Sequence, residues 1–171
     1  MVNRAVVRDG KPYPPNSLKE LEILPGVAEA LDALHQAGFL LIVVTNQPDV
    51  ATGKQDRGVV DAIHDKLLKI LPLDDIMACF CIEGPDCDCY KPKPGMLLEA
   101  AAKWSINLKR SFIIGDRWRD IGAGRAVGCR TFFVDYGYEE QRPENSDHVV
   151  SGLSEAGRII LRKDKYNQGT L

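Results

Sequence analysis

An uninterrupted apolar run at residues 39–44, Phe-Leu-Leu-Ile-Val-Val, constrains the fold of this chain more than any other feature. The run follows a glycine, half of its residues are β-branched, and none of its positions is polar. This pattern predicts a strand buried on both faces, which is typical of a parallel sheet with helices on each side. We therefore expect an α/β protein.

The rest of the chain alternates between helical and strand-like patterns. The expected helices cover residues 26–38, 55–70, 94–104, 118–127 and 153–161, and the expected strands cover residues 39–44, 76–82, 111–114, 131–134 and 147–150. This alternation predicts βαβ units in a three-layer, Rossmann-like parallel sheet. We expect one domain over residues 1–171, with an irregular proline-rich arm at residues 1–25.

Composition excludes several classes of function. The 22 Lys and Arg residues nearly balance the 24 Asp and Glu residues, so the chain has no basic surface typical of a nucleic-acid binder. No stretch approaches the roughly 20 apolar residues of a membrane span, and the first residues lack the apolar run of a signal peptide. We expect a cytoplasmic monomer whose five cysteines are reduced thiols or metal ligands rather than disulfides.

Polar residues follow two of the predicted strands, at the sheet edge where α/β proteins bind ligands. Thr45, Asn46 and Gln47 follow the apolar run, and their hydroxyl, amide and backbone N–H groups suit a phosphate or carboxylate. Asp116 and Asp120 follow the third strand and offer the hard oxygen ligands that suit Mg²⁺. The alternative for residues 45–47 is a simple strand-to-loop cap. The alternative for the two aspartates is that Asp116 is a helix N-cap and Asp120 is a first-turn charge favoured by the helix dipole.

Lys91 lies in an extended segment between two prolines and the cysteine-rich loop, directly before a predicted helix. A lysine held in such a segment can bind a phosphate as a point charge. The alternative is a solvated loop lysine.

Four of the five cysteines fall within eleven residues, as two close pairs: Cys79, Cys81, Cys87 and Cys89. Four soft ligands in two pairs suit tetrahedral Zn²⁺, although the Cys-x-Cys spacing is tighter than the usual zinc knuckle. The alternative is a set of reduced core thiols. Cys129, at the start of a predicted strand, is expected to be a core residue.

Taken in order, these features resemble the haloacid dehalogenase superfamily of phosphatases. Thr45 resembles the second motif of that family, Lys91 the third, and Asp116 with Asp120 the fourth. One branch is especially similar, that of the D-glycero-D-manno-heptose 1,7-bisphosphate phosphatases and histidinol-phosphatases. The similar stretches are ILPGVAEALDAL, LLIVVTNQPDVATG, CDCYKPKPGML and IIGDRWRDIGAGRAVGC.

The resemblance implies a Mg²⁺-dependent phosphatase without a large cap domain, acting on a small phosphorylated metabolite such as heptose 1,7-bisphosphate or histidinol phosphate. It implies catalytic roles for Thr45 and Lys91. The substrate ligands that we expect are Thr45, Asn46, Gln47, Lys91 and Arg117, and the expected Mg²⁺ ligands are Asp116 and Asp120.

In this branch the loop at residues 79–89 holds a structural zinc ion through three cysteines and a histidine. Cys81 stands at the position of the histidine, so the resemblance implies a four-cysteine site here. Tyr90 and Thr52 stand where the branch usually has arginines, and the Tyr90 position is one that contacts substrate in the heptose enzymes.

Members of this family begin with an apolar strand that ends in Asp-x-Asp-Gly, whose first aspartate is the nucleophile and whose second is the general acid and base. The N-terminal region of this sequence has no such motif. One alignment places Asp9 in its second half and Val7 at the nucleophile position; a better one places Asn3 just after the motif. We expect the given chain to lack the central strand and to be inactive, with a start codon assigned too late. The rival interpretation is a non-catalytic protein that binds a phosphorylated ligand or a partner.

Overall fold

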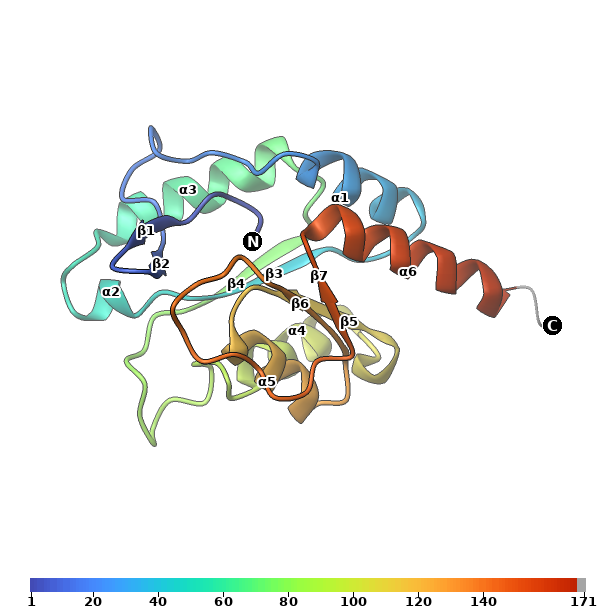
Figure 1. Ribbon diagram of the computed structural model, residues 1–171. Coiled ribbons are helices and arrows are strands. Elements are labelled where there is room, and N and C mark those ends of the chain that lie inside the picture. The colour runs from blue at the N-terminus through green and yellow to red at the C-terminus, as the bar shows by residue number, and fades with distance from the viewer. Residues whose placement is uncertain (169–171) are drawn as a thin grey trace.

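The computed structural model describes residues 1–168 (Figure 1). Its strands are β1 (Val6–Arg8), β2 (Lys11–Tyr13), β3 (Ile42–Asn46), β4 (Asp75–Cys79), β5 (Phe112–Gly115), β6 (Arg130–Val134) and β7 (His148–Val150). Its helices are α1 (Val27–Gln36), α2 (Pro48–Ala51), α3 (Arg57–Ile70), α4 (Gly95–Trp104), α5 (Trp118–Ala126) and α6 (Leu153–Gln168), with a short 3₁₀ helix, η1 (Leu108–Arg110).

The predicted α/β class is confirmed, and the elements form three layers. Helices α1, α3 and α6 cover one side of the strands, and α4 and α5 cover the other (Figure 1). A large apolar core lies beneath the first group and includes Leu31, Leu67, Phe132 and Ile160. A smaller core on the opposite side joins β4 to α4 and includes Met96.

The strands form a parallel arrangement that is interrupted in the middle. β3 pairs with β4, and β5, β6 and β7 pair in that order, all in parallel register. In the part of the chain that the structure describes, no ladder of hydrogen bonds joins β3 to β5. The strand begins at Ile42 rather than Phe39, and the prediction that residues 39–44 are buried on both faces is wrong. All five β3 residues are half-buried, and Leu40 is 48% exposed.

The arm at residues 1–25, expected to be irregular, contains an antiparallel hairpin of β1 and β2. Asp9 and Gly10 form its turn with φ values of 47° and 69°, as a two-residue hairpin loop requires. Asp9 therefore lies in a hairpin turn and not at the end of a sheet strand, and Val7 is 56% exposed. The alignment that places a nucleophile motif at Val7 and Asp9 is wrong.

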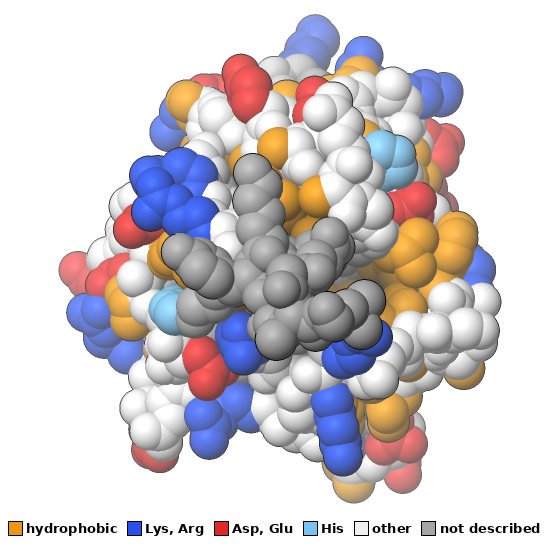
Figure 2. Space-filling model, turned by 90° about the vertical axis from the view of Figure 1, so that its right-hand side faces the viewer, with side chains coloured by type: hydrophobic (Ala, Val, Ile, Leu, Met, Phe, Trp, Pro, Cys, Tyr) orange, Lys and Arg blue, Asp and Glu red, His pale blue; other side chains and the backbone are white. Residues whose placement is uncertain are grey.

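The molecular surface agrees with the balanced charge. On the face shown in Figure 2, Lys and Arg side chains are interspersed with Asp and Glu. None of the helices among the described residues combines the length and apolarity needed to cross a membrane.

Candidate functional site

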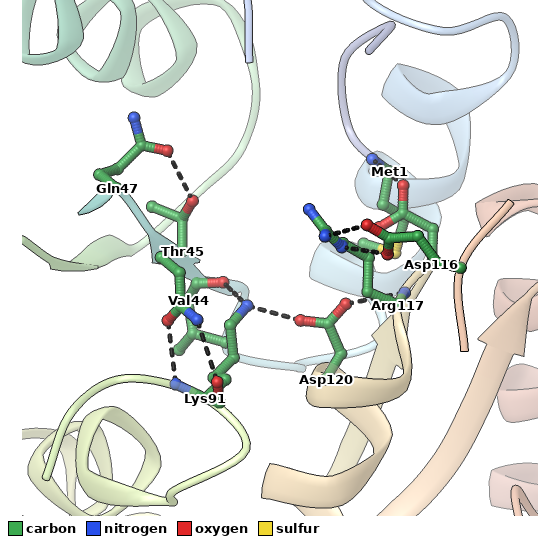
Figure 3. Close-up of polar contacts among 10 residues, drawn as sticks. Met1, Val44, Thr45, Gln47, Lys91, Asp116, Arg117 and Asp120 are labelled. Carbon is green, nitrogen blue, oxygen red and sulfur yellow. Dashed lines mark hydrogen bonds and ion pairs between the residues drawn. The ribbon is translucent and has the colours of Figure 1, made fainter. Parts of the chain in front are cut away.

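Lys91 links the carboxyl end of β3 to the first turn of α5, the helix that follows β5 (Figure 3). Its Nζ atom donates hydrogen bonds to the backbone oxygen of Val44, 2.7 Å away, and to Oδ1 of Asp120, 2.5 Å away. The residue is only 7% exposed. The alternative of a solvated loop lysine is wrong, because the loop before α4 turns this side chain into the molecule.

Asn46 holds the backbone of Lys91 in place. The Lys91 N–H donates to Asn46 Oδ1 at 3.0 Å, and Asn46 Nδ2 donates to the Lys91 carbonyl oxygen at 3.2 Å. Both ends of the amide are thus engaged, so Asn46 acts as a positioning residue in this state. A direct contact between Asn46 and a ligand stays a prediction.

Thr45 and Gln47 lie beside this clamp at the end of β3. The Thr45 hydroxyl donates to Gln47 Oε1 at 3.1 Å, and the Gln47 backbone N–H donates to the carbonyl oxygen of Cys79 at 2.7 Å. Gln47 is buried, whereas Thr45 is half-buried. Thr45 is thus the more accessible of the two residues.

The two aspartates predicted to bind metal come from the end of β5 and the first turn of α5. Asp116 accepts a hydrogen bond from the α-ammonium group of Met1 at 3.2 Å. Asp120 accepts a hydrogen bond from the Arg117 backbone N–H at 3.1 Å. This contact is the one expected of a first-turn helix carboxylate, the alternative to a metal ligand. Gly115 makes this approach possible, since a Cβ there would lie 2.2 Å from Cβ of Asp120.

Tyr138, in the loop after β6, was not predicted to belong to the site. Burial and the neighbouring carboxylate of Asp116 raise the pKa of the Tyr138 phenol well above its usual value. No motif marks this residue, because its contact depends on how a long loop returns to the sheet.

The two arginines of this region are already paired. Arg117, predicted to bind substrate, forms an ion pair with Glu140. Arg119 pairs with Glu83 at 2.7 Å, and its guanidinium lies 5.8 Å from the ring centroid of Tyr90. Arg119 therefore brings a positive charge beside the position where Tyr90 replaces an arginine.

A cavity of about 550 Å³ lies between β3 and β5 and opens beside these polar groups. Thr45, Lys91, Asp116 and Asp120 line it at the carboxyl ends of the strands, and the rest of its lining mixes apolar side chains with further polar and charged ones. The predicted phosphate and metal groups are thus brought to one place.

The cysteine cluster forms a second candidate site, in the loop that leads to Lys91. The sulfur atoms of Cys79, Cys81, Cys87 and Cys89 all lie within 4.8 Å of one another. Cys79 and Cys89 form a disulfide, so the expectation that no cysteine is disulfide-bonded is wrong for this pair. Four sulfur atoms that converge this closely are near enough either to bond in pairs or to share one metal ion. Cys129 is buried and separate from this cluster, which confirms its prediction as a core thiol.

Comparisons with known proteins agree with the motifs. Residues 13–128 match the family of haloacid dehalogenase-like hydrolases. The D-glycero-beta-D-manno-heptose-1,7-bisphosphate 7-phosphatase of Pseudomonas aeruginosa is 36% identical over 126 residues, which cover 71% of each chain. The enzyme of that name from Escherichia coli K12 is 28% identical over 170 residues, covering 90% of this chain and 88% of its own.

A solved structure is similar over nearly the whole chain. It is the D,D-heptose 1,7-bisphosphate phosphatase from B. bronchiseptica complexed with magnesium and phosphate. The TM-score is 0.81 at 29% identity, and the match covers 95% of this chain and 94% of that one.

Proposed function

This chain belongs to the haloacid dehalogenase-like hydrolases, and we propose that its site serves the hydrolysis of a phosphate ester of a small sugar, heptose 1,7-bisphosphate in particular. The names of its relatives support this substrate. The observation that carries the proposal is the buried ammonium group of Lys91, which is held between Val44 of β3 and Asp120 in the first turn of α5.

Lys91 and Thr45 would bind the transferring phosphoryl group. Phosphoryl transfer depends mainly on fixed charges and hydrogen bonds that stabilise the negative charge on the phosphoryl oxygens. Lys91 supplies a fixed positive charge, and the Thr45 hydroxyl would supply a donor at the end of β3 by exchanging its bond to Gln47 for one to the phosphoryl group. Asn46 would keep Lys91 in register, because it holds the backbone of that residue through two hydrogen bonds.

Asp116 and Asp120 would hold Mg²⁺. Mg²⁺ in such sites binds one or two carboxylates and takes its other ligands from water and substrate phosphate, so this donor set fits the ion. The α-ammonium group on Asp116 and the Lys91 ammonium on Asp120 show that each carboxylate accepts a cationic partner. Bound Mg²⁺ would neutralise charge on the phosphate.

Arg119 is the group that we propose for the rest of the sugar phosphate. Its guanidinium and the Tyr90 ring both line the cavity near Lys91. A second phosphate or a sugar hydroxyl would compete with Glu83 for this guanidinium. Arg117 would also bind a phosphate or a sugar hydroxyl once its ion pair with Glu140 is broken.

Zinc binding by the cysteine loop is a further part of the proposal. We propose that the chain is a single domain. With all four cysteines reduced and present as thiolates, its loop at residues 79–89 would hold one Zn²⁺ ion. Its role would be structural, because the loop leads directly into Lys91. Lys93 already ties it together by donating to the carbonyl oxygens of Gly84 and Pro85.

We propose that the 171 residues bind phosphate but do not hydrolyse the ester alone, because the family nucleophile is an aspartate of an Asp-x-Asp-Gly motif. The chain would then act as a phosphate-binding protein, and this second function is favoured by the hairpin-turn position of Asp9.

The two functions are distinguished by comparing the chain with a version carrying an N-terminal apolar strand that ends in Asp-x-Asp-Gly. Phosphate release from heptose 1,7-bisphosphate with Mg²⁺ is measured for both, with histidinol phosphate as the competing substrate. Release by the extended version alone supports the phosphatase. Absence of release from both, with phosphate binding retained, supports the binding protein.

A further inference from the structure

We propose that the cysteine cluster is a site of reversible oxidation, at which a hydroperoxide converts Cys79 and Cys89 from zinc ligands into a disulfide and so expels the metal. The inference rests on the zinc site proposed above and adds a chemical change to its structural role. Three features carry it: the disulfide itself, the positions of the other sulfur atoms, and the place of the bonded pair beside Lys91.

The sulfur atoms of the cluster are placed for a disulfide and for a metal ion alike. Cys79 and Cys89 are bonded, and their Cα atoms are 5.5 Å apart, a usual separation for a disulfide. Three further pairs of sulfur atoms in the cluster are each 3.6 Å apart. This separation is close to the edge of about 3.8 Å in a tetrahedron with Zn–S bonds of about 2.3 Å. The two states therefore need different sulfur positions but little change of the backbone.

The two states exclude each other. A structural zinc ion takes four protein ligands, and a cysteine binds it as a thiolate. The disulfide removes Cys79 and Cys89 from this set and leaves Cys81 and Cys87, which are free cysteines. Two thiolates do not complete a structural zinc site. Formation of the disulfide therefore releases the metal, and reduction restores all four ligands.

The oxidation follows ordinary thiol chemistry. Cys89 is half-buried and Cys79 is buried, so the oxidant reaches Cys89 first. The Cys89 thiolate attacks one oxygen of the hydroperoxide, which breaks the O–O bond, forms a sulfenic acid and releases hydroxide or alkoxide. The Cys79 thiolate then attacks that sulfur, forms the S–S bond and releases hydroxide. The two sulfur atoms lose two electrons, the peroxide gains them, and two protons from solvent neutralise the released anions.

The redox pair lies beside the clamp that positions Lys91. Cys79 is the last residue of β4 and is opposite Asn46 in the register of β3 with β4. Cys89 lies two residues before Lys91, whose backbone Asn46 holds through two hydrogen bonds. The disulfide thus ties the Lys91 segment to β4. The oxidised chain keeps this lysine in place without the metal.

Contacts outside the sulfur atoms hold the loop close to the rest of the molecule in both states. Arg119 of α5 pairs with Glu83 at 2.7 Å. The backbone N–H of Gly95, at the start of α4, donates to the carbonyl oxygen of Asp88 at 3.1 Å. A Cβ on Gly95 would lie 2.3 Å from that oxygen, so loop and helix are closely packed. The cysteines therefore stay near one another while their bonding changes.

The test starts from the reduced, zinc-loaded chain, to which hydrogen peroxide is added. A chelating dye measures the released zinc, and peptide mapping without reductant identifies the linked cysteines. We expect about one zinc ion to be released for each disulfide between Cys79 and Cys89. Addition of dithiothreitol and zinc should restore the starting form.

Two variants separate the redox pair from the rest of the metal site. Cys81→Ser removes a proposed zinc ligand and leaves the pair, so zinc binding should weaken while peroxide still links Cys79 to Cys89. Cys129→Ser changes a buried thiol outside the cluster and should leave both zinc release and the disulfide unchanged. Circular dichroism checks that the variants fold, and the mapping of the unmodified chain stands if one does not.

Hydrogen exchange at the Lys91 amide tests the tie to β4 without reference to activity. This amide donates to Asn46 Oδ1 at 3.0 Å. Its exchange should be slow in the zinc-loaded chain and in the oxidised chain. In the reduced chain, after zinc is removed with a chelator, exchange should be about tenfold faster or more, because neither cross-link is present.

Several outcomes would overturn the proposal. Zinc that stays bound after the disulfide forms, or a disulfide between other cysteines, would exclude the exchange and leave the proposed zinc site standing. A reduced chain that binds no zinc in native mass spectrometry, before peroxide is added, would exclude the zinc site as well. Equal exchange of the Lys91 amide in all three forms would show that neither state holds the segment.

Discussion

Replacing Lys91 by methionine tests whether its link between β3 and α5 includes a buried ion pair that matters to stability. Methionine keeps most of the apolar stem and removes the charge. The side chains of Lys91 and Asp120 are only 9% and 13% exposed, so solvent screens their interaction weakly. The substitution leaves Asp120 without its cation and the Val44 carbonyl without its donor.

The expected cost follows from these contacts. Breaking a buried ion pair by removing one partner costs about 3–5 kcal/mol. Asp120 keeps the hydrogen bond from the Arg117 backbone N–H at 3.1 Å, which offsets part of the loss. We therefore expect Lys91→Met to lower the free energy of unfolding by about 3 kcal/mol, near the lower end of that range.

Urea unfolding followed by circular dichroism measures this change, with the slope checked for equality between variants. Lys103→Met is the matched control. Lys103 pairs with Asp75 at 2.8 Å but is 56% exposed, so the cost should stay below about 1 kcal/mol. The double variant Lys91→Met with Asp120→Asn should lose about 1–3 kcal/mol less than the sum of its single variants. A loss below about 1 kcal/mol for Lys91→Met, with additive effects, would refute the buried pair.

Three further predictions concern packing, pH and metal binding. Gly124→Ala places a Cβ 2.2 Å from a β5 side chain and should cost about 1–3 kcal/mol in the same urea assay, whereas Gly152→Ala meets open space; equal costs would contradict the packing. Backbone and side-chain hydrogen bonds from Thr131 lower the pKa of Asp147, so its stabilisation is present above about pH 4 and is lost as the pH falls through the lower folded pKa. The difference in unfolding free energy between the unmodified chain and Asp147→Asn should narrow below about pH 4, and a constant difference would exclude this linkage. The reduced chain should carry about one zinc ion by native mass spectrometry, lost in Cys87→Ser and kept in Cys129→Ser; loss in both variants would argue against a site in the loop.

Much of the site could be predicted because its residues follow strands in a regular order. Lys91, Asp116 and Asp120 converge at one sheet edge, since parallel strands place their carboxyl ends together. Tyr138 and Glu140 could not be predicted, because their places depend on the path of the loop after β6.

The hairpin of β1 and β2 was predictable in principle, because Asp9-Gly10 is a strong turn signal between short strand-like segments. Proline residues in this region favoured an irregular arm instead. The exposure of β3 could not be predicted from the apolar run at residues 39–44. An apolar run predicts that a strand will be buried, but the burial that is reached depends on which other elements pack beside it.

Phosphate binding tests the central claim most directly, because it asks whether the groups at the ends of β3 and β5 form one anion site. Isothermal titration of inorganic phosphate into the chain, with and without Mg²⁺, is compared with Lys91→Met and with the Lys103→Met control. We predict that the chain binds phosphate and that Mg²⁺ strengthens this binding. Lys91→Met should abolish the binding, whereas Lys103→Met should leave it unchanged. Absence of binding by the folded chain, or binding unchanged in Lys91→Met, would contradict the account.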